Sequence, residues 1–280
     1  MSKPDEVGSQ EGPLQDSVAR DAASMLPVDE HEEEHEENGE TVRARGVYLL
    51  PNLFTTGALF AGFYAIIAGV NSNFEAAAIA IFAAMIFDGL DGRVARLTNT
   101  QSKFGAEYDS LADMVSFGVA PALVIFTWGL GDLGKLGWAA AFAYVACAAL
   151  RLARFNTQIE VVDKKYFVGL ASPPAAALVA SFVWVGHDME VGLLHSVVAA
   201  LLMLGAGLMM VLNVKYQSFK SVDFRGRVPF VVMLLVVFVF VVVTIDPPKV
   251  LLGIAALYAF SGPVCWLFGL RSKAKAEVTG

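Results

Sequence analysis

The sequence predicts an all-α integral membrane protein with about eight transmembrane helices and both termini in the cytoplasm. Composition is the first indication, because 56% of the 280 residues are hydrophobic and only 17% are charged. Soluble domains average about 45–50% apolar and about 25% charged residues. The apolar residues form eight long stretches. Every other connector between these stretches is rich in basic residues, and the remaining connectors have few. The composition excludes a secreted disulfide scaffold, and the net charge of −7 excludes a nucleic-acid reader that depends on a basic surface.

The first 45 residues differ from the rest of the chain. They contain 13 Asp and Glu residues against 4 Lys and Arg, a net charge of −9, whereas the remaining residues carry +2. This segment has too few large apolar residues to bury a core, so we predict an acidic disordered cytoplasmic tail over 1–45. A membrane domain over 46–271 follows, and 272–280 form a second, short cytoplasmic tail. We interpret His31 and His35 as solvated polar residues rather than metal ligands.

The eight apolar stretches have the length that a bilayer requires, which is about 20 residues for a helix. Their connectors are short and rich in Gly, Pro, Asn and Asp, which favour turns. In chain order, the predicted spans are 47–70, 74–97, 104–128, 136–155, 170–186, 191–212, 228–245 and 250–270. No connector is long enough to hold a soluble domain.

The basic residues give the orientation of these spans. Alternate connectors and the two ends hold 16 bases, and the other connectors hold only Lys135 and Lys249. The 16 are Arg43, Arg45, Arg93, Arg96, Lys103, Arg151, Arg154, Lys164, Lys165, Lys215, Lys220, Arg225, Arg227, Arg271, Lys273 and Lys275. Because basic loops stay in the cytoplasm, we predict a multi-pass protein of the inner (cytoplasmic) membrane with both termini inside.

Four aspartates lie in or beside the second and third spans, where a charged side chain costs about 2.5–3.5 kcal/mol at bilayer depth. Asp88 and Asp91 are three residues apart, and Asp109 and Asp113 are four apart, so each pair lies on one helix face. A short turn makes the two helices antiparallel neighbours, and both pairs then converge near the cytoplasmic side. Converging carboxylates repel one another unless cations bind between them. Hard oxygen ligands suit Mg²⁺, Mn²⁺ or Ca²⁺, and Mg²⁺ keeps positions open for phosphates.

Small residues accompany these acids and leave room beside them. They are Gly89, Gly92, Ala95, Gly105 and Ala106. Gly92 and Ala95 would let a flat ring or a phosphate approach the backbone. Close helix packing through small residues is common in membranes and explains them equally well.

This pattern resembles the signature of the CDP-alcohol phosphotransferase family, D-x2-D-G-x2-A-R-x8-G-x3-D-x3-D. Its fixed positions are occupied by Asp88, Asp91, Gly92, Ala95, Arg96, Gly105, Asp109 and Asp113. The segments LLPNLFTTGALFAGFYA, DSLADMVSFGVAPA, LRLARFN, FVGLASPPAAA and VKYQSFK look like the membrane-integral phosphatidylserine synthase branch of that family. The resemblance covers the chain from Tyr48 to Lys220.

The resemblance implies transfer of a phosphatidyl group from CDP-diacylglycerol to the hydroxyl of L-serine, with release of CMP. It implies a two-metal site of Mg²⁺ or Mn²⁺ on Asp88, Asp91, Asp109 and Asp113, with Asp113 also acting as the general base. The residues implied to contact CDP-diacylglycerol are Asn52, Thr55, Gly92, Ala95, Arg96 and Ser102. A homodimer in the lipid bilayer, with its active site facing the cytoplasm, is implied as well.

The acceptor needs contacts of its own, because serine is a zwitterion whose carboxylate requires a cation. Arg151 and Arg154 lie at the cytoplasmic end of the fourth span and are flanked by apolar residues. We therefore expect them to bind the acceptor, although ordinary anchoring by positive-inside residues also accounts for such bases.

Two other functions stay open at this point. One is the same chemistry with another acceptor, such as glycerol 3-phosphate, an inositol compound or choline. The other is an ion-coupled transporter, since acids within membrane helices also mark ion pathways. Transport predicts acids at the bilayer midplane and repeated halves with broken helices. Here the acids cluster at one side and the sequence shows no internal repeat.

Overall fold

The computed structural model describes residues 33–37, 40–44, 49–98, 102–158, 166–217 and 230–278. The chain divides into two compact units, 1–47 and 48–280. In the first unit, β1 (Glu33–Glu37) pairs antiparallel with β2 (Glu40–Ala44). The sequence did not indicate this hairpin. The predicted disorder of the tail stays a prediction, because most of the tail lies outside the described residues.

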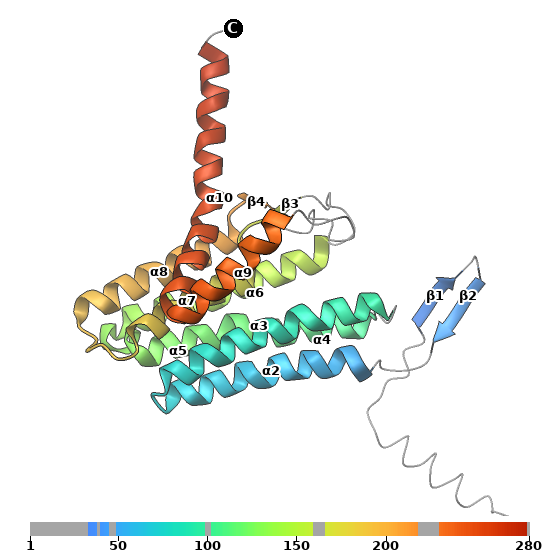
Figure 1. Ribbon diagram of the computed structural model, residues 1–280, viewed down its shortest axis with the longest axis horizontal. Helices are drawn as coiled ribbons and strands as arrows, with labels where there is room; N and C mark the ends of the chain where they lie inside the picture. The colour runs from blue at the N-terminus through green and yellow to red at the C-terminus, as the bar shows by residue number, and fades with distance from the viewer. Residues whose placement is uncertain are drawn as a thin grey trace, which may run out of the picture. The chain divides into compact units, whose positions relative to one another are not determined.

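Each of the eight apolar stretches coincides with a helix of the second unit (Figure 1). The third stretch is one continuous helix with three parts, α4, the π-helix η1 and α5. In chain order the helices are α2 (Leu49–Val70), α3 (Phe74–Leu97), α4 (Lys103–Asp113), η1 (Met114–Val119), α5 (Ala120–Trp128), the short 3-10 helix η2 (Leu130–Leu133), α6 (Lys135–Gln158), α7 (Ser172–Gly186), α8 (Leu193–Val211), α9 (Phe230–Ile245) and α10 (Pro247–Val278). The prediction of a helical protein is therefore confirmed.

Five of these helices are long and apolar enough to cross a membrane. They are the helical segments Leu50–Val70, Phe104–Trp128, Lys135–Thr157, Leu193–Val211 and Pro247–Cys265. α7 is apolar but has only 15 residues, and α3 carries the acids of the predicted site. Eight spans, and the side of the membrane on which the termini lie, stay predictions.

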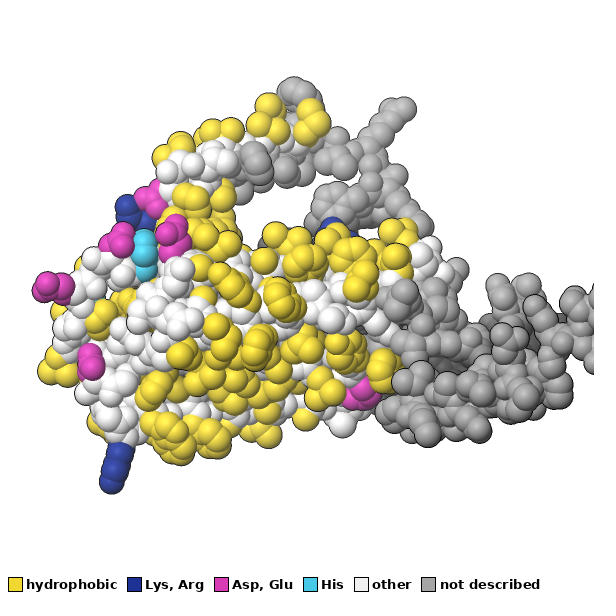
Figure 2. Space-filling model, turned by 90° about the horizontal axis from the view of Figure 1, so that it is seen from below, with side chains coloured by type: hydrophobic (Ala, Val, Ile, Leu, Met, Phe, Trp, Pro, Cys, Tyr) yellow, Lys and Arg dark blue, Asp and Glu magenta, His cyan; other side chains and the backbone are white. Residues whose placement is uncertain are grey.

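The outer surface of the helices is strongly apolar, as contact with lipid requires. Side chains such as Phe60, Leu111 and Trp138 are each more than 60% exposed. Figure 2 shows hydrophobic side chains spread along the flank of the helices, with the charged side chains gathered mainly at one end. An apolar surface of this extent is unfavourable in water, and hydrocarbon requires backbone groups to be paired within helices. The chain is a multi-pass membrane protein.

Small residues let α2 approach its neighbours closely. Ala65 on α2 and Ala77 and Ala84 on α3 have no exposed surface. A Cβ atom at Gly62 of α2 would lie 2.5 Å from the Oγ atom of Ser116 in η1. The Ser116 hydroxyl donates a hydrogen bond to the Ala58 carbonyl at 3.0 Å. Close packing through small residues thus brings η1, which follows Asp113 directly, against α2.

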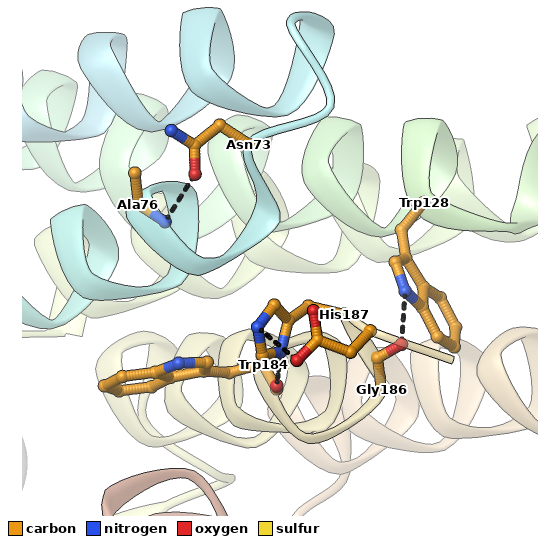
Figure 3. A network of polar contacts seen from close by, with 7 residues as sticks. Asn73, Ala76, Trp128, Trp184, Gly186 and His187 are labelled. Atoms are coloured by element: carbon orange, nitrogen blue, oxygen red, sulfur yellow. Dashed lines mark hydrogen bonds and ion pairs between the residues drawn. The ribbon is translucent and has the colours of Figure 1, made fainter. Parts of the chain in front are cut away.

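Polar contacts close the helix ends where α2 meets α3 and α5 approaches α7 (Figure 3). The Asn73 side chain caps α3 by accepting a hydrogen bond from the Ala76 amide at 3.2 Å. The indole of Trp128 donates to the Gly186 carbonyl at 3.2 Å. Nδ1 of His187 lies 2.7 Å from the Trp184 carbonyl oxygen. The first amides and the last carbonyls of a helix have no partner within it. Asn73 pairs such an amide of α3, and Trp128 pairs such a carbonyl of α7.

A second two-stranded sheet joins segments that are distant in sequence. β3 (Tyr166–Val168) pairs antiparallel with β4 (Lys215–Gln217). Gly169 follows β3 with φ +85°, and a Cβ atom there would overlap the Met210 carbonyl. Only glycine adopts this conformation without strain. The amide of Gly169 donates to the Val214 carbonyl at 2.8 Å, which fixes the start of α7 against the end of α8.

β4 also anchors α10. Tyr216 is 1% exposed, and its hydroxyl donates to the Ala259 carbonyl at 3.0 Å. Its ring packs against Tyr258, with ring centroids 5.7 Å apart. A side chain at Gly262 would overlap the Tyr216 ring. The β3–β4 sheet therefore holds α10, which also packs along α7, beside the helices that carry the site.

Candidate active site

Three of the four predicted acids converge between α3 and α4. One carboxylate oxygen each from Asp88, Asp91 and Asp109 lies within 4.8 Å of the others. Asp91 is buried, and Asp88 and Asp109 are half-buried. The spacing of the acids in the sequence therefore leads to the convergence that we expected from two antiparallel helices.

Asp113 joins the same cluster from the last residue of α4. Its carboxyl group is in hydrogen-bond contact with that of Asp88. The π-helix η1 begins at the next residue, Met114. π-helical turns are rare and often occur at functional sites. The widened turn directly after Asp113 is thus a local feature that the sequence did not reveal.

The chemistry of this donor set suits a hard divalent cation. Carboxylate oxygens are the ligands that Mg²⁺ and Mn²⁺ prefer. Several carboxylates at such short separations repel one another, and burial strengthens that repulsion because the local dielectric is low. A bound cation relieves it. Asp88, Asp91 and Asp109 fit such an ion by their separation and partial burial.

Thr55 supports one of these acids from the neighbouring helix. Its hydroxyl donates to Oδ2 of Asp91 at 2.9 Å, and its side chain is 3% exposed. Such a contact fixes the orientation of a metal-binding carboxylate. The resemblance assigned Thr55 to the CDP-alcohol, and the structure adds this contact with the acid cluster.

A cleft of about 250 Å³ opens beside the acids. Its walls come from α2, α3 and α4, and it contains all six residues that the sequence assigned to CDP-diacylglycerol. The lining consists of Pro51, Asn52, Thr55, Asp91, Gly92, Ala95, Arg96, Ser102, Gly105, Ala106 and Asp109. The cleft thus shares Asp91 and Asp109 with the acid cluster.

One polar atom in the wall of the cleft lacks a partner. Nδ2 of Asn52 is buried and makes no hydrogen bond within the described part of the chain. A buried donor without an acceptor costs about 1–3 kcal/mol. The atom is therefore suited to an acceptor oxygen of a ligand in the cleft.

Two further lining residues, Arg96 and Ser102, provide groups that favour anions. Nε of Arg96 donates to the Gly92 carbonyl at 2.7 Å, which holds the guanidinium along the helix surface. The Ser102 hydroxyl caps α4 by accepting a hydrogen bond from the Gly105 amide at 2.9 Å. A Cβ atom at Gly105 would approach Ser102 Oγ to 3.0 Å. The cleft therefore offers a guanidinium and a helix N-terminus, both of which favour phosphate.

Arg151 is a second basic residue near the acids. It comes from α6, and it interacts electrostatically with both Asp88 and Asp113. Its Nη1 donates to the hydroxyl of Ser172 at 2.6 Å. Arg154 follows one turn later on the same helix and is half-buried. The structure thus brings Arg151, one of the two predicted acceptor residues, within electrostatic range of the predicted general base.

Sequence reasoning missed two residues around Arg151. Ser172 lies in the GLASPP segment, which was noted only for its resemblance. Tyr258 of α10 interacts electrostatically with Arg151, and no motif in the sequence pointed to it. Lys164, Lys165 and Lys220, three of the bases predicted to be cytoplasmic, lie outside the described residues.

Comparison with known proteins extends the signature to most of the membrane domain. The family model described as CDP-alcohol phosphatidyltransferase matches residues 48–212. A CDP-diacylglycerol–serine O-phosphatidyltransferase of Helicobacter pylori is 38% identical over 225 residues, which are 79% of this chain and 92% of that protein. A protein of the same name from Mycobacterium tuberculosis is 43% identical over 139 residues, covering 47% of this chain and 48% of its own. An archaetidylserine synthase of Methanothermobacter thermautotrophicus is 34% identical over 169 residues, covering 60% and 69%. With the four aspartates of the signature gathered in one site, this chain belongs to the CDP-alcohol phosphatidyltransferase family.

Proposed function

We propose that the protein is a phosphatidylserine synthase, which transfers a phosphatidyl group from CDP-diacylglycerol to the hydroxyl of L-serine and releases CMP. The observation that carries this proposal is the acid cluster of Asp88, Asp91, Asp109 and Asp113, with the cleft beside it and Arg151 within electrostatic range. The identity with the Helicobacter pylori enzyme across most of both chains supports serine as the acceptor. Family membership favours group transfer over ion-coupled transport.

The donor binds in the cleft. Arg96 pairs with the pyrophosphate, and Nδ2 of Asn52 donates to one of the donor's oxygens. Gly92 and Ala95 leave the α3 surface low enough for the cytidine diphosphate group to lie against the backbone. The acyl chains of the donor extend into the bilayer, so the cleft must lie at the membrane interface.

The four aspartates would hold two divalent metal ions, Mg²⁺ or Mn²⁺. When bound, such ions neutralise negative charge on phosphate oxygens as the transition state develops. The protein's own contribution is to keep the ligands in place, as the Thr55 hydroxyl does for Asp91.

The acceptor approaches from the side of Arg151. The guanidinium binds the serine carboxylate, with Arg154 adding positive charge nearby. Asp113 takes the proton of the serine hydroxyl while its oxygen attacks the phosphorus that carries diacylglycerol. The bond from that phosphorus to the CMP oxygen breaks, CMP leaves, and no covalent intermediate with the enzyme forms.

In the membrane, we propose eight spans with both termini and the active site on the cytoplasmic side. The alternation of 16 bases against 2 supports this orientation. A homodimer in the inner membrane completes the proposal on the resemblance to the family.

An acceptor panel tests this function. Purified protein with Mn²⁺ or Mg²⁺ and CDP-diacylglycerol is given labelled L-serine, glycerol 3-phosphate, inositol or choline in separate reactions. We expect CMP release and a labelled phospholipid with serine, and neither when EDTA removes the metal. CMP release with glycerol 3-phosphate but not with serine assigns the protein to another acceptor.

A further inference from the structure

Arg151 is held by more than its attraction to the acids. Its guanidinium has five N–H donors in a rigid plane, and one nitrogen, Nη1, donates to Ser172 Oγ at 2.6 Å. Ser172 has no exposed surface. The turn at Gly169 fixes the start of α7 through backbone hydrogen bonds. The hydroxyl that receives the arginine is therefore itself rigidly placed.

A second group, Tyr258 of α10, lies within electrostatic range of the guanidinium. Its ring packs against Tyr216, and the Tyr216 hydroxyl bonds the carbonyl of the adjacent residue, Ala259. The β3–β4 sheet thus fixes the part of α10 that carries Tyr258.

These contacts oppose a strong pull. Asp88 and Asp113 attract Arg151, and a bidentate ion pair with either carboxylate is the arrangement that an unrestrained guanidinium favours. Such a pair would cover the general base and occupy the donors needed for a substrate carboxylate. The fixed hydroxyl of Ser172 accepts one N–H of the guanidinium and restrains it against that pull.

We propose, building on the phosphatidylserine synthase function, that Ser172 and Tyr258 are positioning residues that orient Arg151 toward the carboxylate of the acceptor. They act through Arg151 and do not touch the donor. Because the family model ends at residue 212 and Tyr258 lies beyond it, part of acceptor selection resides in a helix outside the matched region.

The test measures steady-state kinetics of Ser172→Ala and Tyr258→Phe in the full-length protein. We expect Ser172→Ala to raise the KM for serine about 10-fold, the scale of one lost hydrogen bond to a charged group. Tyr258→Phe should change this KM in the same direction. The KM for CDP-diacylglycerol and the Mn²⁺ activation constant should stay within about twofold, because the donor cleft is not altered. Ser172→Thr keeps a hydroxyl at the same place and should restore the KM for serine.

Two matched variants control for the loss of a hydroxyl as such. Ser181→Ala removes a buried hydroxyl on the same helix, one that bonds only backbone carbonyls of its own turn in the described structure. Tyr64→Phe removes an exposed phenol from α2. Both should keep the wild-type KM for serine, and thermal melting confirms that all variants are folded.

The outcomes separate this role from the proposed function. A wild type without serine-dependent product contradicts the function and with it this proposal. A wild type that uses serine, while Ser172→Ala and Tyr258→Phe keep its KM, contradicts only the positioning role. Parallel losses for serine, CDP-diacylglycerol and Mn²⁺, without recovery in Ser172→Thr, also contradict it, because they indicate general distortion.

Discussion

At the scale of single residues, the hydroxyl of Thr55 bonds Asp91, a proposed metal ligand. Thr55→Val keeps the shape of the side chain but removes its hydrogen bond to Asp91. We expect the Mn²⁺ concentration needed for half-maximal activity to rise about 10- to 100-fold, as is typical when the partner of a metal ligand is lost. A titration of activity with Mn²⁺ measures this.

Two variants make that result specific. Thr55→Ser retains the hydroxyl and should behave as wild type. Thr127→Val removes a hydroxyl that bonds only α5 carbonyls in the described structure, and it should not change the metal requirement. An unchanged requirement in Thr55→Val would show that Asp91 is oriented by other contacts.

Asp113 is the proposed general base. Its substitution should lower turnover while nucleotide binding is retained. Asp113→Asn removes the proton acceptor, and general-base catalysis contributes about 10²- to 10⁴-fold. We expect turnover to fall by at least about 100-fold. CDP should still bind measurably by calorimetry, because Asp91 and Asp109 line the cleft directly. Substantial remaining turnover would remove Asp113 from this role.

The convergence of the acids was predictable because it depends on the spacing of residues along single helices. A separation of three or four residues fixes a common face, and one short turn makes the two faces meet. The surroundings of Arg151 were not predictable in this way. Ser172 and Tyr258 reach it from α7 and α10, and only the tertiary packing decides which distant hydroxyls meet a given guanidinium.

At the scale of elements, the helices could be predicted from the length of the apolar stretches. The strands β3 and β4 and the C-terminal end of α10 could not, for specific reasons. β3 and β4 have three residues each, too few for an alternating pattern. The eighth span was predicted to end at 270, where basic residues begin. α10 nevertheless continues to Val278, because Lys, Ala and Glu favour a helix as well as apolar residues do.

The contact between α2 and η1 predicts an effect on stability. Gly62→Ala places a methyl group 2.5 Å from Ser116 Oγ, so the two helices must separate. We expect a loss of about 1–3 kcal/mol, the usual cost of overpacking, seen as a lower Tm of the detergent-solubilised protein. The control is Gly205→Ala in α8, where no atom lies within 4 Å of the added group. A Tm equal to that of the control would show that η1 adjusts without cost.

At the scale of the whole molecule, the orientation in the membrane is open to direct measurement. Native Cys147 and Cys265 are first replaced by alanine. We then expect Asp188→Cys, between α7 and α8, to react with a membrane-impermeant maleimide in intact cells. Ser9→Cys in the tail should react only after permeabilisation, because the basic connectors hold the termini inside. The reverse pattern would invert the proposed topology.

The acidic tail forms a unit separate from the membrane domain. Every residue placed in the site comes from 48–280, so deleting 1–40 should leave kcat and the KM for serine unchanged. Assays of the truncated protein in the same detergent check this. A collapse in rate would give the tail a part in catalysis.

The candidate site draws on two parts of the chain. α2, α3 and α4 line the cleft, whereas Arg151 of α6 bonds Ser172 of α7 and lies within electrostatic range of Tyr258 of α10. Under the proposed assignment, the head group attached to the lipid can be re-engineered by exchanging the later helices alone. A chimera of that kind would inherit an intact apparatus for activating the nucleotide-linked lipid, and it would alter only which phospholipid accumulates in the bilayer.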